Sequence, residues 1–173
     1  MEEKDFDLIK SAIEKIMNKE IKGIHKLLQA TVDCGGSFIF HKKCDNIPNT
    51  LILYESAGKR KFGGFASQCW NTNSGVIDKN CFLFSLDNKK IYFPKKENYI
   101  SISCKLNDGP SFLSQGFYII EIYKNIFNNK SLRTYENKKL HELLFDGDNN
   151  ALSEDGNFLG INAKEYEVFE IIF

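Results

Sequence analysis

The chain has 173 residues, 42% of them hydrophobic, and its 23 Lys and Arg residues balance its 23 Asp and Glu residues. This length supports one well-packed core and is short for two, and a zero net charge disfavours general nucleic-acid binding, which needs a basic excess. No apolar run approaches the roughly 20 residues of a spanning helix, and the acidic first residues do not resemble a signal peptide. We therefore expect a soluble cytoplasmic protein without a transmembrane segment.

The first predicted element is an amphipathic helix. Apolar residues recur at three- and four-residue steps among Lys and Glu, at Phe6, Ile9, Ile13, Ile16 and Met17. Gly23 offers a stop, and a second short amphipathic stretch follows at 24–28. We expect the apolar face to pack on its own domain, with a partner-binding arm as the alternative. Residues 1–24 are interpreted as a helical extension and residues 25–173 as the domain proper.

Most of the remaining elements are predicted to be strands. Short runs rich in aromatic and β-branched residues, separated by turn residues, lie at 51–54, 62–65, 81–86, 100–104, 117–123 and 165–173. Apolar residues at helical spacing predict a helix over 130–145. This pattern favours an antiparallel sandwich over βαβ units. The expected fold is mostly β, of the α+β class: a two-sheet antiparallel β-sandwich with an N-terminal helix and a further flanking helix.

Several positions carry physical reasons for their residue type. Asp45 and Asn46 can accept backbone N–H groups and hold a turn. Gly63 and Gly64 indicate a strand bend or a close backbone approach, and Trp70 is expected in the core with its indole N–H satisfied. The predicted core includes Phe62, Phe65, Trp70, Phe82, Phe84 and Phe169.

Three dense blocks stand out: Phe-His-Lys-Lys-Cys-Asp-Asn at 40–46, Phe-Gly-Gly-Phe-Ala-Ser-Gln-Cys-Trp at 62–70 and Phe-Leu-Phe-Ser-Leu at 82–86. In this order and at these distances they resemble the TLDc domain, the module of the oxidation-resistance proteins. The resemblance covers about residues 27–173. The positions that match the family's structural motifs are Asp45, Asn46, Gly63, Gly64, Trp70, Gly109, Pro110, Gly160, Glu165 and Glu167. The block at 109–117 departs from the family's usual Gly-Pro-x-Phe-Gly and Asp-led strand, which bears on any function hosted by that loop.

The resemblance implies a non-catalytic protein-interaction domain with a role in oxidative-stress protection and in binding or regulating the vacuolar-type proton ATPase. The alternative is a structural accessory subunit of a large assembly such as the cytoskeleton or a cilium. A thiol-dependent enzyme is the least favoured hypothesis. No cofactor or metal is expected, and the protein partner would recruit the chain to an organelle surface or to the cytoskeleton.

Patterns that could carry chemistry are weak. The five cysteines, Cys34, Cys44, Cys69, Cys81 and Cys104, form no C-x-x-C pair and fit no zinc motif, so all are expected as reduced thiols. His41 and Cys44 could form a dyad oriented by Asp45 or Glu55, but a strand there would point them to opposite faces. Residues 146–157 lack the Gly and Glu of a calcium loop, and we expect a solvated turn.

Charge is distributed unevenly. Residues 42–141 carry 16 Lys and Arg against 8 Asp and Glu, whereas residues 142–173 carry 8 acids and one Lys. The two blocks either neutralise each other or form a dipolar surface that docks on a charged partner. The candidate partner-binding residues lie near strand ends: Lys59, Arg60, Lys61, Lys89 and Lys90. They are expected in solvated hairpin loops. If they meet at one edge, together with Lys95 and Lys96, they form a basic rim for an acidic protein surface or anionic headgroups.

Overall fold

The computed structural model describes residues 3–71, 75–94, 100–103, 109–114, 117–124, 130–134 and 161–173. Its helices are α1 (Glu3–Met17) and α2 (Ser37–Cys44). Its strands are β1 (Gly23–Gln29), β2 (Thr50–Ser56), β3 (Lys61–Ala66), β4 (Val76–Asp78), β5 (Phe82–Ser85), β6 (Lys90–Tyr92), β7 (Ile100–Ser103), β8 (Ser111–Ser114), β9 (Phe117–Lys124), β10 (Lys130–Thr134) and β11 (Ile161–Ile172).

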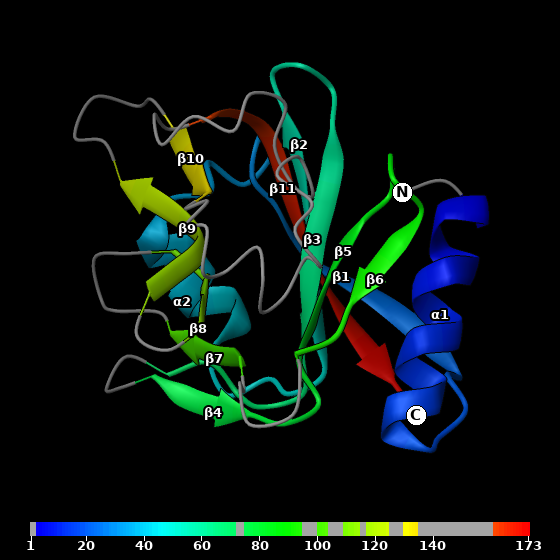
Figure 1. Ribbon diagram of the computed structural model, residues 1–173. Coiled ribbons are helices and arrows are strands. Elements are labelled where there is room, and N and C mark those ends of the chain that lie inside the picture. Colours follow the sequence, from blue (N-terminus) through cyan, green and yellow to red (C-terminus); the bar gives the residue numbers. More distant parts are fainter. Residues whose placement is uncertain are drawn as a thin grey trace.

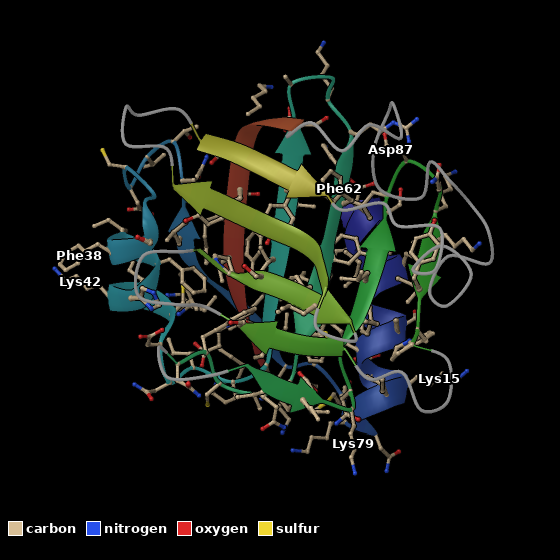
Figure 2. All side chains as sticks on the ribbon, turned by 60° about the vertical axis from the view of Figure 1, so that its left-hand side comes forward. Lys15, Phe38, Lys42, Phe62, Lys79 and Asp87 are labelled. Atoms are coloured by element: carbon tan, nitrogen blue, oxygen red, sulfur yellow. The ribbon has the colours of Figure 1, made fainter. Side chains whose placement is uncertain are left out.

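The strands form two antiparallel sheets. The first, which we call the central sheet, has the order β1-β11-β2-β3-β5-β6, and the second sheet has the order β4-β7-β8-β9-β10. The two are joined where β10 pairs with the first residues of β11, Leu132 opposite Ile161. In Figure 2 the second sheet lies in front and its strands run across those of the central sheet, while α1 lies behind. The mostly β sandwich predicted from the sequence is confirmed.

The central sheet is apolar on both faces, because alternate residues of a strand point to opposite sides. In β2, Leu51 and Leu53 face α1, whereas Ile52 and Tyr54 face the second sheet and α2. The side facing α1, which we call the outer layer, buries Ile9 and Ile13 of the helix. The inner layer lies between the sheets. All six predicted core residues are buried, Phe62 and Trp70 in the inner layer and the other four in the outer layer.

Residues 24–28, described from the sequence only as an amphipathic stretch, belong to strand β1, which pairs with β11. Two predictions of local structure are wrong. The segment after Gly36 is helix α2 rather than a strand and turn, since Phe40 and Cys44, four residues apart, share one buried face. The predicted helix over 130–145 begins instead with strand β10, which pairs with β9. The rest of that helix, 135–145, lies outside the described residues.

Candidate functional site

The candidate dyad lies on α2, and its geometry does not favour thiol catalysis. The imidazole Nδ1 of His41 lies 3.0 Å from a carboxylate oxygen of Asp45, one helical turn later. Cys44 is fully buried in the inner layer, so a substrate cannot reach its thiol. The strand geometry used to discount this pair was wrong, but burial of the thiol leads to the same interpretation. The His41–Asp45 contact lies where α2 ends and the chain turns toward β2.

The glycine pair and Trp70 of the family motifs are structural. A Cβ on Gly63 would lie 1.9 Å from the carbonyl oxygen of Ile52, and one on Gly64 would lie 2.6 Å from the ring of Phe112. The predicted close approach at Gly63 and Gly64 is therefore correct. Trp70 donates its indole N–H to Thr50 Oγ1 at 2.7 Å and is almost fully buried, as expected.

The motif residues around these also hold the fold. Asn46 has a φ of 64° and donates its backbone N–H to Trp70 at 3.1 Å. Gly109 and Pro110 are buried, and the Tyr54 hydroxyl donates to the Pro110 carbonyl at 3.5 Å. Gly160 lies outside the described residues, as do Lys95, Lys96, Cys104 and the residues of the discounted calcium loop.

Glu165 and Glu167 on β11 attach the neighbouring β1 segment. Glu165 accepts the backbone N–H of Thr31 at 2.9 Å and the side-chain amide of Gln29 at 3.3 Å. Glu167 is ion-paired with Lys26. Because these carboxylates are engaged within the fold, their motif is explained by stability without a ligand.

Sequence reasoning missed a buried carboxylate. Asp78, at the end of β4, is fully buried and accepts hydrogen bonds from Ser67 Oγ at 2.6 Å and from the backbone N–H groups of Ser67, Gln68 and Asn80. Burial raises the pKa of the neighbouring Cys81 thiol, and the charge of Asp78 adds to that effect. The Asp78–Asn80 bond is an Asx turn that the Asp-Lys-Asn sequence could have indicated.

The basic candidates are brought together at one end of the central sheet. Lys59, Arg60 and Lys61 come from the β2–β3 hairpin, which forms the tip at the top of Figure 1, and Lys89 and Lys90 come from the β5–β6 hairpin. The backbone N–H of Leu86 donates to the Lys61 carbonyl at 2.9 Å. The Lys61 N–H donates to the Asp87 carboxylate at 2.7 Å. These two bonds hold the hairpins side by side, and we call the five residues the basic rim.

The lysines of the rim differ in their surroundings. Lys59 and Lys89 are exposed at the hairpin tips. Lys61 is half-buried, with its ammonium 3.9 Å from Asp5 of α1, and the ammonium of Lys90 lies over the ring of Tyr92. The rim therefore has two exposed ammonium groups, those of Lys59 and Lys89, next to cations that contact other side chains of the domain.

The described acids near the C-terminus do not neutralise this rim. Glu165 and Glu167 engage the β1 segment, and Glu170 lies 3.5 Å from His25 of β1. Lys164, within the acidic block, pairs with Glu55 at 2.6 Å. The described acids of this block thus have their partners in or next to β1 and not in the basic rim.

Within the described ranges, no group of three or more His, Cys, Asp or Glu side chains is placed to hold a metal ion. In the same part of the chain, no helix is long and apolar enough to cross a membrane.

The sequence model of a protein family described as the TLDc domain matches residues 1–172. No curated protein matches the chain.

Proposed function

The chain belongs to the TLDc domain family, and we propose that it acts by binding a protein partner through its basic rim rather than by catalysis. The observation that carries this proposal is the joining of two basic hairpins at one end of the central sheet. Exposed cations gathered at an edge accelerate association with an acidic surface and select against basic partners. The burial of Cys44 supports the non-catalytic interpretation.

For the partner we propose the vacuolar-type proton ATPase, as the resemblance to the family implies, with a role in protection against oxidative stress. The chain would work in the cytoplasm and be recruited to the membrane surface that carries the pump. A structural accessory role in a cytoskeletal or ciliary assembly uses the same surface, so the identity of the bound proteins separates the two candidates.

The test is affinity purification of the tagged chain from its native cell, followed by mass spectrometry. We expect proton-pump subunits with the wild-type chain and their loss with the charge-reversed variant K59E/K89E. The matched control is K15E/K79E, which reverses two lysines that Figure 2 shows away from Asp87 of the β5–β6 turn. Tubulin or other filament proteins in place of pump subunits would favour the structural role.

Salt dependence provides a second test with the purified partner. Association should slow as ionic strength rises, because exposed charges are screened over about 8 Å at physiological salt. Reversal of Lys59, Arg60 and Lys61 to Glu should lower the association rate in the same way. If neither higher ionic strength nor the triple charge reversal changes the association rate, docking by the rim is contradicted. The exposed apolar residues then become the candidate contact.

A further inference from the structure

Two lysines of the basic rim occupy the left-handed region of the backbone. The φ angle is 68° at Lys59 and 50° at Lys89. This conformation is unfavourable for a residue with a Cβ, and Gly and Asn are the residues that adopt it most readily. The chain follows that preference at Asn18, Asn46 and Asn49 and departs from it at Cys34 and at the two lysines. The two hairpin tips therefore carry lysine where Gly or Asn is more stable.

The two tips share one design. The N–H of Lys59 donates to the Ser56 carbonyl at 2.9 Å, and the N–H of Lys89 donates to the Leu86 carbonyl at 3.2 Å, so each lysine closes a four-residue turn. A second basic residue follows each of them, Arg60 or Lys90. Because the turn fixes the backbone, less conformational freedom is lost when these side chains bind a ligand. The left-handed residue closes the turn in each hairpin, but the choice of lysine for that position on two adjacent hairpins has no evident benefit for folding.

We propose that Lys59 and Lys89 are a pair of binding contacts kept at the expense of stability, and that their ligand is a pair of carboxylates on a protein surface. This inference deepens the proposed function and rests on it. Lysine is suited to such contacts because its ammonium carries a compact charge at the end of a long side chain.

The charges around the pair favour a protein over a membrane or a polyphosphate. Asp87 bonds the Lys61 N–H within the rim, Asp5 lies beside the Lys61 ammonium, and Glu55 pairs with Lys164 at the other side of the β2–β3 hairpin. These interspersed acids lower the net positive charge of the region, which weakens its attraction to a continuous anionic surface. A protein can instead place carboxylates opposite Lys59 and Lys89 and neutral or basic groups opposite the acids.

The experiment compares three double variants of the full chain. K59G/K89G removes both cations and relieves the backbone strain, K59R/K89R keeps the charge and the strain, and K15Q/K79Q removes two cations elsewhere. The probe is a labelled soluble peptide whose Glu residues are separated by Ser and Gly. Its competitors are inorganic polyphosphate and vesicles of phosphatidylcholine with phosphatidylserine. Binding is measured by fluorescence anisotropy and stability by thermal unfolding.

We expect K59G/K89G to bind the peptide about threefold or more weakly and to melt about 2–4 °C higher than the wild type. The arginine variant and K15Q/K79Q should bind as the wild type does. Unchanged peptide binding by K59G/K89G, or a lower melting temperature, overturns the inference. The inference is also overturned if the wild type binds vesicles or polyphosphate more tightly than the peptide and K59G/K89G loses that binding. If charge reversal of the rim releases the native partner while K59G/K89G retains it, the proposed function stands and this inference fails.

Discussion

The two apolar layers on either side of the central sheet are built by different means. The outer layer under α1 consists of hydrocarbon side chains, such as Ile9, Leu51 and Phe84. The inner layer contains Trp70, Tyr54, Tyr166 and buried thiols, and the polar atoms of these three aromatic side chains have defined hydrogen-bond partners. Hydrocarbons of similar volume can replace one another at modest cost, whereas a buried polar atom needs a particular partner. The outer layer thus stabilises the fold by burying apolar surface, whereas the hydrogen bonds of the inner layer fix the positions of the second sheet and α2 relative to the central sheet.

The largest effect is expected from truncation in the outer layer. Phe84 is fully buried there, and Phe84→Ala should lower the free energy of unfolding by about 3–5 kcal/mol, because lost burial and the residual cavity add. Urea unfolding measures this loss. The matched control is Phe38→Ala on α2, at a phenylalanine that is 74% exposed and points outward in Figure 2, which should change stability by less than about 0.5 kcal/mol. A loss below about 1 kcal/mol at Phe84 would contradict its place in the core.

A smaller effect is expected where the inner layer is tightest. The added methyl of Gly64→Ala would lie 2.6 Å from the Phe112 ring of β8, and we expect a loss of about 1–3 kcal/mol from overpacking. Because the obstacle is a side chain, Phe112→Leu should recover part of the loss in the double variant. Strict additivity in this double-mutant cycle would contradict the contact between the two sheets.

A third effect tests the hydrogen bonds that distinguish the inner layer. The hydroxyl of Tyr166 donates to the Gly35 carbonyl at 3.3 Å, and burial raises the pKa of this tyrosine, so the hydroxyl stays protonated at neutral pH. Tyr166→Phe should cost about 1 kcal/mol. Tyr54→Phe, which removes a longer bond of 3.5 Å, should cost less in the same chemical denaturation. An equal loss in the free energy of unfolding at both positions would indicate that the strengths of these hydrogen bonds do not determine the stability of the inner layer.

The sequence predicted α1 and the central strands better than it predicted β1 and α2. Short continuous apolar runs bounded by turn residues, such as 51–54, are typical of strands that are buried on both faces. The stretch 24–28 is only partly apolar, and its pairing with β11 involves residues more than a hundred positions away. The helix α2 was missed because it is short and its apolar residues are not confined to one face: Phe40 and Cys44 are buried, whereas Phe38 is exposed. The local sequence pattern therefore predicts secondary structure where the burial pattern is regular, and pairing with distant residues determines it elsewhere.

The candidate site was predictable in part. Clusters of lysine near turns indicated the basic rim, and the order of the strands in the structure brings the two hairpins together. The left-handed backbone at Lys59 and Lys89 could not be predicted, because lysine is not a residue that signals it. Asp78 was overlooked because an acid at the end of a strand usually lies in solvent, and its four donors come largely from a loop around Ser67.

The smallest effect concerns the thiols, whose exposure differs between the surface and the inner layer. Cys34 is exposed in the loop before α2, whereas Cys44 and Cys81 are buried in the inner layer. Since the thiolate is the reactive form, the raised pKa of Cys81 protects it further. Alkylation of the native protein should modify Cys34 first and change the free energy of unfolding by less than about 0.5 kcal/mol. Cys44 and Cys81 should react only as fast as the inner layer opens.

Peptide mass spectrometry over time measures the alkylation rate of each thiol, and Cys34→Ser serves as the control. All thiols are expected to be free, so a protein two hydrogens lighter under non-reducing conditions contradicts that expectation. Rapid labelling of Cys44 would show that the inner layer is less closed than its hydrogen bonds imply, and would reopen the hypothesis of a thiol-dependent enzyme.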